Sequence, residues 1–139
     1  MTDGRHSNST VLIAEDEEAL KMLATMTIKA RGFRVLAASS AEEALNLWQQ
    51  HADEIVLLFT DIVMNGPMTG FDVAKQIRAQ TAALPVIFSS GHTGALANDI
   101  AELQQRVTYL PKPYRQSELG ALISAMVTVY PSESNSAAA

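Results

Sequence analysis

Five short hydrophobic runs recur along the chain, and each has the length of a β-strand. They occupy residues 11–14, 33–37, 55–59, 86–88 and 107–110. The first and third runs are apolar at every position, which is typical of strands that helices cover on both faces. We therefore expect these two strands to lie in the centre of a sheet.

Between these runs, apolar residues recur every three or four positions, which is the period of an amphipathic helix. The clearest stripes are Ala41, Ala44, Leu45 and Trp48, and Leu119, Leu122, Ile123, Met126, Val127 and Tyr130. Ser40 and Glu43 form a capping-box pattern at a helix start, and Gly32 suits the left-handed residue that ends a helix. Gly70 precedes another helical pattern, so residues 65–70 are expected to be loop.

The alternation of strand and helix patterns predicts an α/β fold. Strictly alternating units are joined by right-handed crossovers, which give a parallel sheet with helices on both faces. We therefore expect a (βα)₅ doubly wound five-stranded parallel sheet. The 139 residues suit a single core. Because small polar residues dominate both ends, we expect one domain over 10–130, with flexible tails over 1–9 and 131–139.

Polar residues follow four of the predicted strands, where ligands bind in a doubly wound sheet. These residues are Glu15 and Asp16 after the first strand, Asp61 after the third, Ser89 and Ser90 after the fourth, and Lys112 after the fifth. Three carboxylates in one crevice repel one another unless one is protonated or a cation neutralises them. Since the ligands would be oxygen atoms and cysteine is absent, we expect Mg²⁺.

Asp61 is the candidate nucleophile because a strand of apolar residues followed by Thr60 holds it at the sheet edge. A carboxylate can attack phosphorus to form an aspartyl phosphate, and the protein then positions the groups and neutralises the phosphoryl oxygens. Lys112, held between two prolines, provides an ammonium group for one oxygen. Ser90 can donate its hydroxyl to another.

Four segments resemble the receiver domains of response regulators in two-component signalling. They are VLIAEDE at 11–17, TDIVM at 60–64, PVIFSSGH at 85–92 and YLPKPY at 109–114. Each alone is a weak signal, but four in this order at strand ends are specific, and the match covers nearly the whole body. The resemblance implies the flavodoxin-like strand order 2-1-3-4-5. It also implies a signalling switch that catalyses only its own phosphorylation and dephosphorylation.

The resemblance assigns a role to each motif residue. It makes Glu15 and Asp16 the acidic pair, Asp61 the phosphoacceptor, Ser90 the switch hydroxyl, Tyr109 the switch aromatic, Lys112 the phosphate-contacting lysine, and Asp16, Asp61 and the Val63 backbone carbonyl the Mg²⁺ ligands. A cis bond before Pro113 is expected on the same ground.

The chain departs from the commonest family pattern at three places. Glu15 stands where aspartate is usual, and we expect its longer side chain to reach the metal through water. The loop 64–70 has one extra residue and a late proline, as in receivers attached to hybrid kinases. Val63 and His92 occupy the two positions that, in the family, tune the lifetime of the phosphoryl group.

Partners follow from the resemblance and from the charge. The expected phosphoryl donor is a histidine kinase or a histidine phosphotransfer protein, and the expected output surface for a downstream protein combines the fourth helix, fifth strand and fifth helix. Both a stand-alone regulator and a hybrid-kinase receiver fit. A net charge of −5 argues against nucleic-acid binding. With no cysteine, no signal peptide and no membrane-spanning run, a cytoplasmic protein is expected.

Two other functions are alternatives to the receiver interpretation of this sequence. A metal-dependent phosphohydrolase also forms an aspartyl phosphate, but it places a second aspartate two residues after the nucleophile, where this chain has Val63. A flavodoxin-like cofactor binder needs a hydroxyl- and glycine-rich loop after the first strand, where this chain is acidic.

For Glu17 and Glu18 the preferred interpretation is a solvated helix start. The helically spaced Met22 and Met26 are expected to pack against the core or a helix face.

Overall fold

The computed structural model describes residues 9–91 and 106–138, with side chains up to Val127 in the second segment. Five strands form one parallel sheet in the order β2-β1-β3-β4-β5, as predicted. They are β1 (Thr10–Ala14), β2 (Arg34–Ala38), β3 (Ile55–Asp61), β4 (Val86–Ser90) and β5 (Val107–Pro111). The two strands expected to be central, β1 and β3, do occupy interior positions of the sheet.

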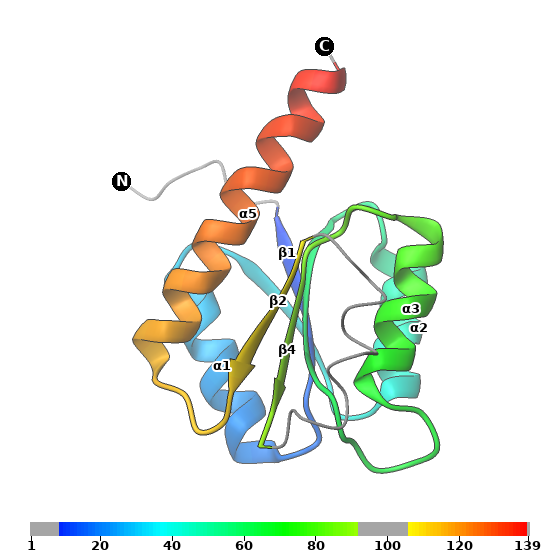
Figure 1. The fold of residues 1–139 in the computed structure, drawn as a ribbon, viewed down its shortest axis with the longest axis vertical. Coiled ribbons are helices and arrows are strands. Elements are labelled where there is room, and N and C mark those ends of the chain that lie inside the picture. Colours follow the sequence, from blue (N-terminus) through cyan, green and yellow to red (C-terminus); the bar gives the residue numbers. More distant parts are fainter. Residues whose placement is uncertain (1–8, 92–105, 139) are drawn as a thin grey trace.

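Helices cover both faces of this sheet. They are α1 (Glu18–Ala30), α2 (Ala41–His51), α3 (Gly70–Gln80) and α5 (Gln116–Ala138). Figure 1 shows α1 and α5 on one face and α2 and α3 on the other. The fourth helix expected from the (βα)₅ pattern, and His92 with it, fall in residues 92–105, outside the described part of the chain. Among the described residues, no helix is long and apolar enough to cross a membrane.

Two hydrophobic cores flank the sheet, because successive side chains of a strand point to opposite faces. Leu12, Leu58 and Phe88 enter the core under α2 and α3. Ile13 and Phe59, their neighbours in sequence, enter the core under α1 and α5. Each fully buried aliphatic side chain stabilises the fold by about 1.5–3 kcal/mol. The central strands are therefore held rigidly from both sides, up to their carboxyl ends.

The strands are longer at their carboxyl ends than the hydrophobic runs predict. Thr60 and Asp61 belong to β3, and Ser89 and Ser90 belong to β4. Asp61 is in register with Ser89 across the β3–β4 pair. Backbone N–H and C=O groups make these ladder hydrogen bonds whatever the side chain, so polar residues at the end of a run can continue the strand. The candidate residues are consequently part of the sheet.

Helix termini confirm part of the capping prediction. The Ser40 hydroxyl accepts the Glu43 N–H, but the Glu43 carboxylate accepts the N–H of Ser39 and leaves the reciprocal bond of a capping box unmade. Gly32 has a φ of 97°, as expected after α1. The prediction that Gly70 is loop was wrong. Thr69 and Asp72 make a complete capping box, which starts α3 at Gly70.

The packing of the helices agrees with the predicted stripes except at α1. Leu119, Ile123 and Val127 are buried, and Trp48 is 1% exposed. The prediction for Met22 and Met26 was wrong, since they are 57% and 59% exposed. Their spacing places them on one side of α1, but that side faces solvent. The backbone of α5 continues as helix to Ala138, into the segment expected to be a flexible tail. The domain limits remain predictions.

Gly70 is required by a close approach of two backbone segments. A Cβ atom at this position would lie 1.8 Å from the backbone oxygen of Asp61, whereas a Cβ atom at Gly91 would meet nothing within 4 Å. The Gly70 N–H also donates to the carbonyl oxygen of Ile62, 2.8 Å away. The start of α3 is thus pressed against the end of β3.

We therefore expect Gly70→Ala to lower the free energy of unfolding by about 3 kcal/mol, the upper end of what overpacking costs. Gly91→Ala is the matched control and should change it by less than about 0.5 kcal/mol. Urea unfolding followed by circular dichroism measures both. Equal effects of the two substitutions would contradict the close approach.

Candidate functional site

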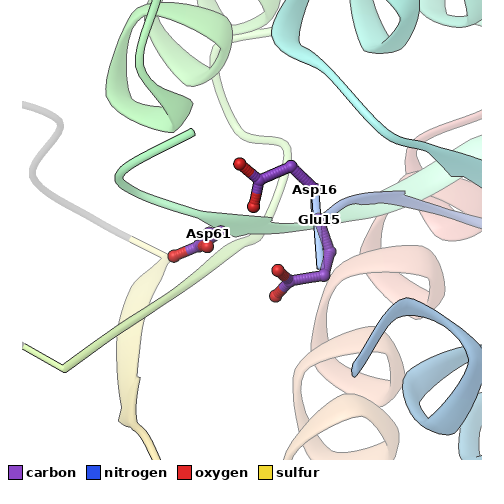
Figure 2. Close-up of side chains that lie close together, drawn as sticks. All are labelled: Glu15, Asp16 and Asp61. Atoms are coloured by element: carbon purple, nitrogen blue, oxygen red, sulfur yellow. The ribbon is translucent and has the colours of Figure 1, made fainter. Parts of the chain in front are cut away.

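Three carboxylates converge at the carboxyl ends of the two central strands. Oxygen atoms of Glu15, Asp16 and Asp61 all lie within 4.8 Å of one another, as Figure 2 illustrates. The parallel pairing of β1 with β3 brings them together, since Ala14 is in register with Thr60. The acidic cluster predicted from the sequence is therefore present.

Glu15 and Asp16 point in different directions from the end of β1 (Figure 2). Glu15 follows Val11 and Ile13 in the alternation of the strand, so it extends toward the face covered by α1 and α5. Its side chain is 3% exposed, and one carboxylate oxygen accepts the N–H of Glu17 at 3.0 Å. Asp16 instead accepts the N–H of Asn65 at 2.9 Å, which ties the loop after β3 to the site.

Lys112 joins two of these carboxylates. Its Nζ atom lies 3.0 Å from Oδ2 of Asp61 and 3.2 Å from Oε1 of Glu15. The lysine backbone is fixed as well, because its N–H donates to the carbonyl oxygen of Ser90 at 3.1 Å and the bond to Pro113 is cis, as predicted. Both the backbone and the side chain of Lys112 are therefore held in position, unlike those of an ordinary surface lysine.

The ion pair between Lys112 and Glu15 is not among the contacts predicted from the sequence. The predicted contact of Glu15, with the metal through a water, stays a prediction. The alternation of β1 directs Glu15 toward the α1 and α5 side, and its carboxylate, one methylene further from the backbone than that of an aspartate, lies 3.2 Å from the Lys112 ammonium there. The signal in the sequence for this ion pair was the presence of glutamate instead of aspartate at position 15.

Burial dominates the acid–base behaviour of the site. It raises the pKa of Glu15, although the Glu17 N–H and Lys112 act against it. It also raises the pKa of Asp61, where Lys112 opposes the shift and the charge of Asp16 adds to it. Burial alone would lower the pKa of Lys112, but the hydrogen bond and charge of Asp61, together with Glu15, raise it. The single positive charge of Lys112 cannot neutralise the negative charges of three carboxylates.

A hard divalent cation fits this donor set. The oxygen atoms of Glu15, Asp16 and Asp61 are close enough to share one ion, and Mg²⁺ takes one or two carboxylates while keeping several waters. Val63 follows β3 and its side chain is 62% exposed. The use of its backbone carbonyl as a ligand remains a prediction.

The predicted switch residues lie beside this cluster. Ser90 ends β4 and is 3% exposed. Its backbone carbonyl accepts a hydrogen bond from the phenol of Tyr109, which is partly buried on β5. Burial and the charge of Asp61 raise the pKa of Tyr109. Three of the four strand ends named from the sequence thus contribute side chains to one cluster, and the fourth, at Ser90, is joined to it through the backbone N–H of Lys112. The switch roles of Ser90 and Tyr109 stay predictions.

Comparisons with known proteins agree with this arrangement. Residues 11–124 match the response regulator receiver domain family, so the chain belongs to that family. The chain is 29% identical over 121 residues to the sensor kinase CckA of Brucella abortus and 33% identical over 118 residues to a probable transcriptional regulator, ycf27, of Guillardia theta. These alignments cover 86% and 84% of the chain but only 13% and 44% of those proteins.

Solved structures show the same fold. The receiver domain of the hybrid histidine kinase CckA superimposes with a TM-score of 0.72 at 32% identity, covering 86% of this chain and 99% of that one. A response regulator receiver protein from Pseudomonas putida gives a TM-score of 0.74 at 32% identity, covering 85% and 97%. The chain is therefore a receiver domain of the kind found in two-component systems, including hybrid kinases.

The raised pKa of Asp61 predicts a particular pH dependence of stability. A group whose pKa is higher in the folded state favours folding while it is protonated, and that contribution is lost as pH rises through the raised pKa. The substitution Asp61→Asn removes this loss of stability, because an amide does not ionise. Without divalent cations, the stability of the variant relative to the parent should therefore grow as pH rises above the ordinary value of 3.8, by about 1.4 kcal/mol for each unit by which the pKa is raised.

Urea unfolding at pH 4, 5, 6 and 7 in the presence of a chelator measures this difference. Asp53→Asn, which alters an exposed carboxylate, is the control and should show a difference that does not grow with pH. A pH-independent difference for Asp61→Asn would contradict the buried, destabilised carboxylate.

Proposed function

We propose that Asp61 accepts a phosphoryl group from a phosphohistidine of a partner kinase or phosphotransfer protein. The observation that carries this proposal is the placement of Lys112, whose ammonium contacts Asp61 and Glu15 together beside Asp16. A carboxylate in such a setting is aimed out of the sheet edge and has a fixed cation next to the oxygen that would attack. This arrangement suits transfer to the carboxylate, where the protein supplies position and charge.

In the transfer step, a carboxylate oxygen of Asp61 forms a bond to phosphorus as the bond from phosphorus to the imidazole nitrogen breaks. The electron pair of the broken bond stays on the imidazole. Mg²⁺, held by Asp16, Asp61 and the Val63 carbonyl with Glu15 behind a water, would supply positive charge for the phosphoryl oxygens. Lys112 neutralises one of those oxygens, and the Ser90 hydroxyl donates to another.

The phosphorylated state differs from the free state in which contacts Lys112 and Ser90 make. A ligand shifts a two-state equilibrium only through contacts that differ between the states. Ser90 is linked through its backbone carbonyl to the Tyr109 phenol, so a movement of Ser90 changes the environment of Tyr109 on β5. We infer that this change reaches a downstream protein through the face formed by the fourth helix, β5 and α5.

Both a response regulator and a receiver within a larger kinase fit the relatives. The chain spans 13% of the sensor kinase and 44% and 49% of two transcriptional regulators that it matches. We infer that the donor is a histidine kinase or a histidine phosphotransfer protein in either case.

Incubation with acetyl phosphate and Mg²⁺ should label the protein at Asp61 with an acid-stable, hydroxylamine-sensitive phosphate. Asp61→Asn should lose the label entirely, because the amide is a poor nucleophile. Intact-mass spectrometry detects the added phosphate. A label retained in the variant would place the nucleophile elsewhere, and multiple turnover of a small phosphoester would support the phosphohydrolase alternative.

Asp16→Ala should weaken Mg²⁺ binding by at least about tenfold, as loss of a metal-site residue does. Glu18→Gln is the matched control, because Glu18 is an acidic residue of the same segment whose side chain is 74% exposed. Its Mg²⁺ affinity should stay within about twofold of the parent. Isothermal titration calorimetry compares the three proteins, and an equal loss in both variants would indicate a diffuse charge effect instead of a site.

A further inference from the structure

Among the described residues, three buried side-chain hydroxyls have no hydrogen-bond partner: those of Thr10, Ser89 and Tyr114. A buried donor without a partner costs roughly 1–3 kcal/mol, so its presence calls for an explanation. Thr10 begins β1, at the opposite end of the strand from the acidic cluster. Ser89 and Tyr114 lie at the carboxyl end of the sheet, near the site.

Tyr114 lies beneath the acidic cluster on the α1 and α5 side. Its ring packs edge-on against Phe59, with the ring centroids 5.9 Å apart. Phe59 precedes Asp61 by two residues on β3, so both side chains leave the strand on the same face. Glu15 extends toward this face as well (Figure 2). The phenol is thus placed under the two carboxylates that share Lys112.

The phenol stays protonated and able to donate at neutral pH. Burial and the nearby charge of Glu15 raise the pKa of Tyr114 to about 12. Glu15 makes the largest contribution of any charged group to this shift, ahead of Lys112 and Asp61. The Tyr114 ring lies on the face of the sheet toward which Glu15 extends, yet its hydroxyl makes no hydrogen bond while Lys112 contacts that carboxylate.

Phosphorylation would change the charges around Glu15. Lys112 divides its ammonium between Glu15 and Asp61 in this structure, and a phosphoryl group on Asp61 would draw it away. Glu15, with 3% of its side chain exposed, would then keep only the N–H of Glu17 as a donor within the described protein. Mg²⁺ in the proposed site would reach Glu15 only through a water, and a buried carboxylate that loses its direct contact with a cation is destabilised unless another donor replaces that contact.

We propose that Tyr114 is a positioning residue whose phenol donates a hydrogen bond to Glu15 when Lys112 moves to the phosphoryl group. The proposal rests on the proposed function of Asp61. It gives the unpartnered hydroxyl of Tyr114 a role, because the hydrogen bond would be made in the phosphorylated state and is absent in the free one. The phenol would release Lys112 from Glu15 and so favour the phosphorylated arrangement.

Beryllofluoride with Mg²⁺ serves as the stable phosphoryl mimic for the test. Tyr114→Phe should bind it about tenfold or more weakly than the parent, which corresponds to the loss of one hydrogen bond to a charged group. In the ion-free state, the unfolding midpoint of Tyr114→Phe should be unchanged or higher, because an unpartnered hydroxyl has been removed. Thr10→Val is the matched control, since it deletes a buried, unpartnered hydroxyl far from the site. Its beryllofluoride affinity should stay within about twofold of the parent.

A spectroscopic signal separates a positioning role from a merely structural one. With tyrosine labelled by ¹³C at the hydroxyl-bearing carbon, the three tyrosine signals of the chain are assigned by Tyr→Phe substitution. The Tyr114 signal should shift on addition of beryllofluoride with Mg²⁺, as its hydroxyl becomes a donor. The same addition to Thr10→Val should give the same shift.

The outcomes distinguish the proposed role of Tyr114 from the proposed function of Asp61. If the parent protein does not bind beryllofluoride, the proposed function of Asp61 fails. If the parent binds it while the Tyr114 signal stays in place and Tyr114→Phe binds equally well, the proposal for Tyr114 is overturned and the function stands. A lower unfolding midpoint of ion-free Tyr114→Phe would also overturn it, because the hydroxyl would then already have a partner in the free state.

Discussion

The site depends on the balance between one ammonium group and three carboxylates at the carboxyl ends of parallel strands. Lys112 contacts Asp61 and Glu15 at 3.0 and 3.2 Å, and Asp16 lies beside them and accepts the backbone N–H of Asn65. Burial raises the pKa of Glu15 and Asp61, so the uncompensated charge has a cost in stability. Such a site favours the binding of a cation, which adds positive charge, and of a phosphoryl group, whose oxygens can bind the Lys112 ammonium.

The fold maintains this strained arrangement because the central strands are fixed on both faces. Ile13 and Phe59 are locked in one core, and Leu12 and Leu58 in the other. The close approach of Gly70 to the Asp61 backbone fixes the end of β3 from a third direction. The carboxylates therefore cannot separate to relieve their repulsion. Lys112 is anchored through one backbone hydrogen bond to Ser90 and through the contacts of its ammonium group with Asp61 and Glu15.

Two hydrogen bonds connect the site to neighbouring segments. Asp16 holds the loop after β3 through the N–H of Asn65, and the Ser90 carbonyl holds the Tyr109 phenol. Under the proposed function, these are the contacts through which a change of charge at the site would reach those segments. In the free state a third group, the Tyr114 phenol, stays unpartnered beneath Glu15. Under the proposed phosphorylation, the hydrogen bonding of the site would differ between the free and the phosphorylated state, which is what a switch requires.

The sequence by itself determined the architecture and most of the site, because period and order along the chain carry that information. Continuous apolar runs predicted that β1 and β3 are central, and residues after strands in a doubly wound sheet must meet at one edge, which placed Asp16, Asp61 and Lys112 together. Tertiary structure alone decided the rest. That Glu15 pairs with Lys112, that Met22 and Met26 face solvent, and that Tyr114 has an unpartnered hydroxyl all depend on side-chain direction and on neighbours distant in the chain. Spacing along one segment does not contain those neighbours, because they are brought into contact only when the sheet and helices pack.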